Sequence, residues 1–117
     1  LILSDDCADL YHPRTLRGAM GALFRMRADV VTDFASAVPA LRASGRRVYA
    51  AELRDGALSV DEAKPTAADC FVIGNEGHGI PPEISALCTG SVYIPIAPTS
   101  ESLNAATAAS ILAYIQR

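Results

Sequence analysis

The pattern of apolar and polar residues alternates between two periods along the chain. Short apolar runs predict buried strands, and segments with helical spacing lie between them. The predicted strands cover residues 1–4, 28–32, 46–52, 69–73 and 92–96. Because strands alternate with helices, the sequence indicates an α/β fold with a mostly parallel sheet flanked by helices.

Three of the predicted helices lie between these strands. They cover residues 13–24, 34–44 and 81–87. Pro13 suits the first turn of the first helix, and Asp33 is a good N-cap for the second. Gly18 and Gly21 lie inside the first helix and are expected to allow close packing against a neighbour. Residues 57–68 have no strong period and are expected to form a polar connector.

The last helix is expected to begin near Ser102, as its N-cap, and to continue to the end of the chain. From Leu103 to Ile115, alanine, leucine and isoleucine surround its axis. A helix that is apolar on all sides must be buried on all sides. One small domain rarely covers such a helix completely, so the pattern predicts a subunit interface.

Two loops stand out, because each ends a predicted strand abruptly and precedes a helix. The first is Gly74–Gly79, with the sequence GNEGHG, and the second is Ala97–Asn104, with the sequence APTSESLN. In parallel α/β sheets, ligands bind in loops at the carboxyl ends of the strands. The glycines of the first loop allow positive φ angles and a close approach of backbone to a ligand.

The composition of both loops argues against a phosphate site. Neither loop contains lysine or arginine, and the first does not match GxGxxG. Backbone groups and the apolar residues Ile94, Ile96 and Leu103 dominate instead. This surface suits a flat aromatic ring such as adenine, held by main-chain hydrogen bonds, and therefore favours a nucleoside-like cofactor.

The polar side chains of the loops leave alternatives open. Glu76 could orient an arginine, act as a base, or bond to backbone amides of its own loop. Asn75 is either a turn residue in the left-handed conformation or a polar anchor. Asn104 either directs its amide into the loop space or helps to cap the last helix. His78 has no nucleophile or second acid at a suitable spacing, and Ser102 has no paired base.

Composition limits the function classes further. The chain has 117 residues, enough for one domain, and a net charge of −3, which argues against a freestanding electrostatic nucleic-acid binder. Its most basic part, Arg14–Arg27, is either a solvated helix face or a patch facing RNA. Three widely spaced cysteines without a CxxC pair predict no metal site and free thiols in a reducing compartment, hence the cytoplasm.

No apolar run is long enough to span a bilayer, and we expect no membrane association. The chain opens without Met on an apolar run, so we expect a single domain over 1–117 that lacks its first strand–helix unit.

Three segments carry a resemblance to a known family. They are Ile73–Ile80 (IGNEGHGI), Ile94–Pro95–Ile96 followed by Ser100–Ala106 (SESLNAA), and Tyr11–Phe24 (YHPRTLRGAMGALF). These segments resemble parts of the SpoU/TrmH family of RNA ribose 2′-O-methyltransferases, within the SPOUT superfamily. The segment IGNEGHGI resembles the family's second motif, and the segment that ends in SESLNAA resembles its third motif. The segment YHPRTLRGAMGALF resembles its second helix.

This resemblance implies a fold, a cofactor and a set of site residues. The fold is an α/β domain with a deep C-terminal trefoil knot that binds S-adenosyl-L-methionine, in a homodimer joined through the last helix. The implied cofactor-binding residues are Gly74, Asn75, Gly77, Ile94, Ile96 and Leu103. The implied catalytic residues are Glu76, Ser102 and Asn104. The family needs no metal.

The implied activity is methylation of a ribose 2′-hydroxyl in an rRNA or tRNA substrate. In the family, an arginine with a nearby asparagine helps to activate that hydroxyl, and their motif corresponds to positions before residue 1. One alternative is a non-catalytic knotted dimer that binds cofactor or RNA without turnover. A weaker one is a flavodoxin-like nucleotide binder, which would have no knot.

Overall fold

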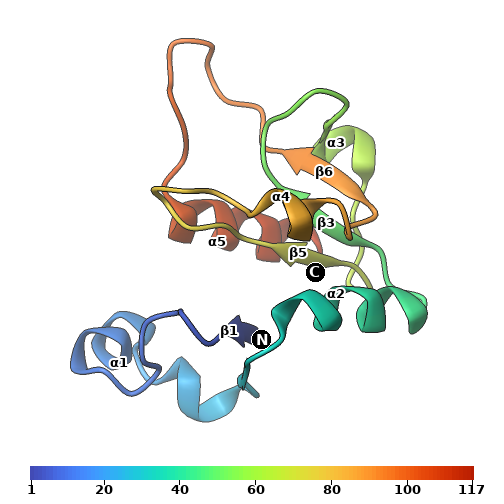
Figure 1. Ribbon diagram of the computed structural model, residues 1–117. Coiled ribbons are helices and arrows are strands. Elements are labelled where there is room, and N and C mark those ends of the chain that lie inside the picture. The colour runs from blue at the N-terminus through green and yellow to red at the C-terminus, as the bar shows by residue number, and fades with distance from the viewer. The chain divides into compact units, whose positions relative to one another are not determined.

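The computed structural model describes residues 1–117, which form two compact units, Leu1–Ser36 and Ala37–Arg117. The first unit holds a parallel pair of strands, β1 (Ile2–Ser4) and β2 (Asp29–Val31), in which Ile2 lies opposite Asp29. Between these strands come α1 (Pro13–Ala19) and the 3₁₀ helix η1 (Ala22–Arg25). Both strands were expected, and Figure 1 shows this unit at the blue end of its colour bar.

The prediction of one helix over 13–24 is wrong. Met20 and Gly21 adopt left-handed conformations, with φ of 48° and 79°, and two such residues in succession end a right-handed helix. Beside Gly18 and Gly21 the space is open, since an added Cβ would meet no atom within 4 Å. The expected close packing at these glycines is therefore also wrong, and Gly21 serves the turn through its positive φ.

The second unit is built on a four-stranded sheet, whose parallel arrangement was predicted but whose strand over Leu58–Ser59 was not. Its strand order is β4 (Leu58–Ser59), β6 (Gly90–Tyr93), β3 (Val48–Ala51), β5 (Cys70–Val72). The pairs β3–β5, β3–β6 and β4–β6 are all parallel. The carboxyl ends of all four strands therefore lie at one edge of the sheet.

Four helices accompany this sheet. They are α2 (Phe34–Ala43), whose first residues belong to the first unit, α3 (Val60–Ala63), α4 (Pro82–Ser85) and α5 (Ala105–Ile115). Asp33 precedes α2 and accepts a hydrogen bond from the Ser36 backbone N–H, as expected of an N-cap. Gly45, with a φ of 88°, follows the end of α2.

The expected polar connector over 57–68 is wrong, because it contains β4 and α3. Ser59 caps α3 by accepting from the Glu62 backbone N–H, and the Glu62 carboxylate accepts from the Ser59 backbone N–H. This reciprocal pair is a capping box. The Ser59 backbone N–H and the Ser59 hydroxyl both donate to the Glu62 carboxylate, at 2.9 and 2.8 Å, and these two bonds hold the pKa of Glu62 below its ordinary value. Two short elements of two and four residues are too brief to produce a readable hydrophobic period.

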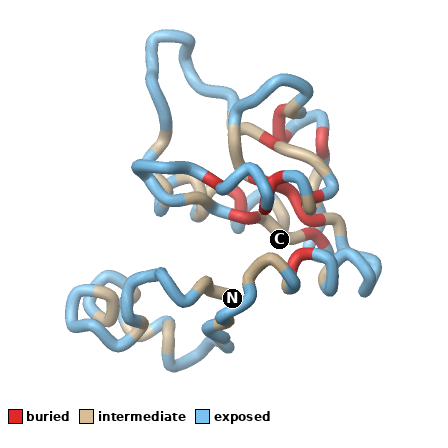
Figure 2. Tube along the Cα trace, in the orientation of Figure 1, coloured by how far each residue is buried: buried red, intermediate tan, exposed pale blue.

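The core of the second unit lies between the sheet and α5. Buried Tyr49 and Val92 of the sheet form one cluster with Val60, Ala63 and Leu112. Leu112 is the fully buried residue of α5, only 2% exposed. Figure 2 shows the buried segments of this unit concentrated along its strands. The core therefore fixes α5 on the sheet.

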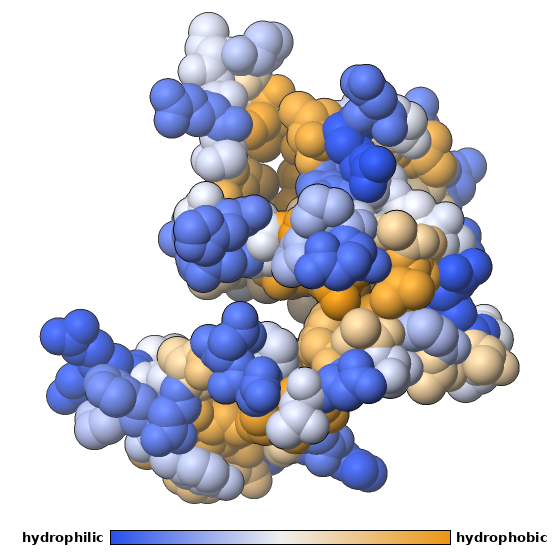
Figure 3. Space-filling view, viewed as in Figure 1, coloured by the Kyte–Doolittle hydropathy of each residue, from blue (hydrophilic) through white to orange (hydrophobic).

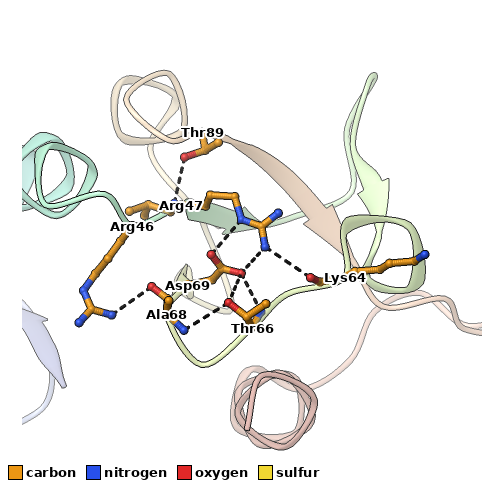
Figure 4. Close-up of polar contacts among 8 residues, drawn as sticks. Arg46, Arg47, Lys64, Thr66, Ala68, Asp69 and Thr89 are labelled. Atoms are coloured by element: carbon orange, nitrogen blue, oxygen red, sulfur yellow. Dashed lines mark hydrogen bonds and ion pairs between the residues drawn. The ribbon is translucent and has the colours of Figure 1, made fainter.

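An ion pair joins the amino ends of β3 and β5, away from the carboxyl edge. Arg47 donates to both carboxylate oxygens of Asp69, at 2.9 and 2.6 Å, as Figure 4 shows. The Thr66 backbone N–H donates to the same carboxylate at 2.7 Å. The Arg47 guanidinium is the main reason why the pKa of Asp69 is lowered. At the same end of the sheet, the Thr89 hydroxyl accepts a hydrogen bond from the Val48 backbone N–H at 3.0 Å.

Candidate functional site

The two loops singled out in the sequence begin at the same edge of the sheet. The first follows β5 and the second follows β6, and both strands pair with β3 in parallel. This edge is where ligands bind in open parallel α/β sheets. β6 ends at Tyr93 rather than at Ile96, because Pro95 has no backbone N–H to extend the ladder. Ile94 and Ile96 therefore belong to the loop.

The first loop is closed by hydrogen bonds across its base. Asn75 and Gly79 exchange two backbone bonds, of 3.2 and 2.8 Å. The Asn75 side-chain oxygen accepts from the backbone N–H groups of Gly77 and His78, at 2.7 and 3.1 Å. Asn75 is not in a left-handed conformation. Of the two interpretations left open, its side chain is thus a polar anchor for the loop itself.

Gly74 is required by the close approach of the two sides of this loop. A Cβ at this position would lie 2.5 Å from the Gly79 carbonyl carbon and 2.7 Å from the Ile80 nitrogen. Gly79 has a φ of 68°, which a glycine adopts without strain. The closest approach at Gly74 is thus to the loop's own backbone, which gives the turn one narrow shape.

The second loop borders a cavity of about 550 Å³. Ile94, Ile96, Ser102 and Leu103 line it, together with the ends of β3 and β6. Orange atoms line a hollow beside this projecting loop in the upper part of Figure 3. From Pro95 to Leu103, the only bond between backbone groups runs from the Ser100 N–H to the Ala97 carbonyl, 2.9 Å. Most backbone N–H and C=O groups of this segment are therefore free to form hydrogen bonds with a ligand, and they lie beside apolar side chains.

A second cavity, of about 520 Å³, lies against the first loop. Its lining includes Gly74, Asn75 and Glu76 from that loop, and Ser102 and Asn104 from the segment before α5. The two cavities adjoin each other, since five residues line both: Ala51, Glu52, Ser102, Leu103 and Ala108. The tertiary structure thus brings the two loops to one continuous site.

Eight of the nine predicted site residues line one or both cavities: Gly74, Asn75, Glu76, Ile94, Ile96, Ser102, Leu103 and Asn104. Gly77 lines neither and instead donates its N–H to Asn75. The expectation that Ser102 caps the last helix is wrong. Asn104 is the N-cap, and its side-chain oxygen accepts from Ala106 N–H and Thr107 N–H at 3.0 and 3.3 Å. The capping alternative for Asn104 is confirmed.

Glu52 is a site residue that sequence reasoning missed. It follows the central strand β3 directly and is the one charged residue that lines both cavities. Ser91 donates its hydroxyl to the Glu52 carboxylate at 2.8 Å, and Arg54 pairs with it at 3.4 Å. The available signal was its position at the carboxyl end of a buried strand.

The lining fits a nucleoside-like cofactor better than a nucleotide. No lysine or arginine lines either cavity, so a phosphate would find no cation. Each cavity falls within the usual range of about 300–1,000 Å³ for small-molecule sites. No cluster of three or more His, Cys, Asp or Glu side chains is placed to hold a metal ion. No helix is long and apolar enough to span a bilayer.

The amino-acid sequence is similar to a known protein family and to curated members of related function. The sequence model of the SpoU rRNA Methylase family matches residues 1–114. The 23S rRNA (guanosine(2553)-2′-O)-methyltransferase RlmP of Bacillus subtilis is 34% identical over 114 residues, which cover 97% of this chain and 45% of that protein. The chain therefore spans less than half the length of this curated relative.

Two solved structures are similar over nearly the whole chain. A TrmH-family protein from Porphyromonas gingivalis matches with a TM-score of 0.86 and 34% identity, over 99% of this chain and 47% of that one. The SpoU methyltransferase AviRb from Streptomyces viridochromogenes, in complex with AdoMet, matches with a TM-score of 0.82 and 33% identity. That match covers 97% of this chain and 47% of AviRb. The mixed α/β fold with parallel strands is thus shared with these structures.

Proposed function

This chain belongs to the SpoU rRNA methylase family, and from this premise we propose that its protein methylates a ribose 2′-hydroxyl of rRNA or tRNA with S-adenosylmethionine. One observation carries the proposal: the two loops that hold the motifs line adjoining cavities, and Ser102 and Leu103 line both of these cavities. RlmP of Bacillus subtilis is named as a 23S rRNA 2′-O-methyltransferase, and AviRb was crystallised with the same cofactor.

The cavity beside the second loop is the proposed cofactor site. Ile94, Ile96 and Leu103 offer an apolar surface for the adenine ring, and free backbone groups of the loop offer hydrogen bonds to its edge. Gly74 and Asn75 give the neighbouring loop its shape. Gly77 contributes through its bond to Asn75 rather than by lining the site.

The cavity beside the first loop is the proposed place for the ribose. When bound, S-adenosylmethionine would supply a methyl group for transfer: the ribose 2′-oxygen would bond to the methyl carbon while the opposite carbon–sulfur bond breaks, and S-adenosylhomocysteine would leave. The protein must therefore orient the ribose hydroxyl and allow its proton to leave. Three side chains that line this cavity are available for these tasks: the Glu76 carboxylate can accept a hydrogen bond, the Ser102 hydroxyl can donate or accept one, and the Asn104 amide nitrogen can donate one while its oxygen caps α5.

The resemblance to the family also suggests the domain organisation, the knot and the oligomeric state. We propose that residues 1–117 belong to one methyltransferase domain, and that its C-terminal segment is tucked through a loop as a trefoil knot. In support, Ser102–Ala105 line the same cavity as the Gly74–Gly79 loop. We also propose a homodimer through α5, because the ring of Tyr114 is 65% exposed on that helix, beside exposed Ala106 and Ala113 and the small polar residues Thr107 and Ser110. Three free cysteines support a reducing, cytoplasmic location.

A turnover assay on the full-length protein tests the activity. We expect calorimetry to detect binding of S-adenosylhomocysteine, and mass spectrometry to detect new 2′-O-methylnucleosides after incubation with bulk rRNA or tRNA. Leu103→Asp should abolish cofactor binding, since it buries a charge against an apolar ring. Binding without methyl transfer to any bulk RNA would support the non-catalytic alternative. Absence of both binding and transfer would refute the proposal.

A further inference from the structure

The first unit carries a concentration of positive charge that the proposed cofactor site does not use. Between Asp9 and Asp29 the chain has four arginines and no acidic residue. These are four of the ten basic residues of a chain whose net charge is −3. We call Leu10–Ala28 the basic segment. Its charge is opposite to that of the chain as a whole, which points to an anionic partner.

Three of these arginines have no anionic partner within the structure. Arg14 and Arg17 lie three residues apart on α1, a spacing that places side chains on one side of a helix. Arg25 lies in η1. All three are exposed, and none makes an ion pair or a side-chain hydrogen bond. Arg27 differs, because it pairs with Asp29 at 3.0 Å.

Large apolar side chains are exposed in or beside the same elements. Tyr11 is 67% exposed, Met20 85% and Phe24 74%. The left-handed turn at Met20 and Gly21 ends α1 and begins η1, and the two helices contact each other. The broken helix therefore brings Phe24 and Arg25 into the same part of the unit as the arginines of α1.

We propose that the basic segment binds an unpaired stretch of the substrate RNA. Arg14, Arg17 and Arg25 contact phosphates, and Tyr11 and Phe24 stack on bases. This inference rests on the proposed function, which supplies RNA as the partner. It adds an RNA-binding surface on the first unit, whose residues do not line either cavity.

Three chemical features favour an unpaired strand over other partners. A guanidinium group can bind a phosphate through two parallel hydrogen bonds. Phosphates of the RNA would therefore supply the anionic partners that the three arginines lack within the protein. Exposed aromatic side chains can stack on the flat faces of unpaired bases. In an A-form duplex these faces are already stacked on neighbouring bases and are inaccessible. A second copy of the same surface would instead bring like charges together.

Fluorescence anisotropy with the full-length protein tests the arginines. The probes are a twelve-nucleotide oligouridylate and a twelve-base-pair RNA duplex, each titrated from 50 to 300 mM salt. The triple variant Arg14→Gln/Arg17→Gln/Arg25→Gln should bind oligouridylate about tenfold more weakly or worse. Its plot of log affinity against log salt should lose a slope of about 2, since each single-strand phosphate contact contributes about 0.7.

Two controls separate local contacts from general charge. Arg17→Gln is matched with Arg46→Gln, which removes the same charge from an exposed position at the amino end of β3. Only the first should weaken oligouridylate binding. The variant Arg14→Lys/Arg17→Lys/Arg25→Lys keeps the charge and should keep most of the salt slope. Calorimetry with S-adenosylhomocysteine should give wild-type affinity for all variants, which confirms that they fold.

Phe24→Leu tests stacking, because it keeps an apolar side chain and removes the ring. Oligouridylate binding should weaken about tenfold, while duplex binding should barely change. Wild-type affinity of the arginine variants for oligouridylate, or no binding by the wild type, would overturn the inference. Equal losses on duplex and single strand would also overturn it. The proposed function would survive each of these results if the wild type still binds cofactor and methylates RNA.

Discussion

Gly74 shows how one residue fixes the shape of the candidate site. Its Cα approaches the far side of the first loop so closely that a Cβ would overlap backbone atoms of Gly79 and Ile80. Backbone atoms on both sides leave no flexible side chain to move away. The glycine was notable in the sequence as one of several, but its contact partner is visible only in the fold.

Gly74→Ala should therefore weaken binding of S-adenosylhomocysteine by about tenfold or more, because the loop must open to accommodate the methyl group. The free energy of unfolding should fall by about 1–3 kcal/mol, as for other overpacked positions. Calorimetry and urea titration measure the two effects. Gly90→Ala is the matched control, since an added Cβ there meets nothing within 4 Å. Equal behaviour of the two variants would contradict this account.

At the scale of elements, α5 depends on a cap that the sequence pattern assigned to the wrong residue. Both Ser102 and Asn104 are good N-cap types, and both precede the apolar run. The structure begins α5 at Ala105, so Asn104 is the residue whose oxygen reaches the free N–H groups. A shift of two residues lies within the usual uncertainty of helix ends read from sequence.

Asn104→Ala should lower the free energy of unfolding by about 1 kcal/mol through loss of this cap. Ser102→Ala should change it by less than about 0.5 kcal/mol, because Ser102 makes no capping bond. Thermal or urea unfolding followed by circular dichroism compares the two. A larger loss from Ser102→Ala than from Asn104→Ala would show that the cap is assigned wrongly.

The amino ends of β3 and β5 provide a pH-dependent contribution to stability. Because Arg47 lowers the pKa of Asp69 in the folded protein, this contribution is fully present above the unfolded pKa, about 3.9. It is lost as the pH falls through the lower folded pKa. The Asp69 side chain is only 4% exposed, so solvent screens the pair weakly on that side.

Asp69→Asn should cost on the order of 1–3 kcal/mol of unfolding free energy at pH 7. This deficit should shrink below about pH 4, because the wild type loses the same contribution there. Urea titrations at pH 3 to 7 measure the difference. Asp61→Asn removes an exposed carboxylate that makes no ion pair or side-chain hydrogen bond, and serves as control. A deficit that is constant over this pH range would refute the role of the ion pair.

At the scale of the whole molecule, α5 has two different sides. Leu112 is buried in the core of the second unit, whereas Tyr114 is 65% exposed. The sequence pattern predicted burial all round, and the second unit covers only one side. The other side is the surface through which we propose that two copies associate.

Tyr114→Glu should convert the proposed dimer of the full-length protein to monomer in light scattering, because it buries a charge in an apolar interface. Ala86→Glu adds the same charge at an exposed position just after α4 and should leave the dimer intact. Leu112→Glu is unsuitable as a probe, since it would disrupt the core. A stable dimer of Tyr114→Glu would contradict the assigned interface.

Sequence by itself determined the parallel α/β class, five of the six strands and the two loops of the site. Hydrophobic period and turn chemistry are local properties, so they can be read from neighbouring residues. Family motifs in the right order likewise require no structure.

Only the tertiary structure decided which residues share the site. It placed Glu52 between the two cavities, kept Gly77 out of both, broke the first helix at Met20, and gave the cap of α5 to Asn104. These outcomes depend on strand order and on contacts between segments far apart in the chain. No local pattern encodes such distances, because packing selects among conformations that are locally equivalent.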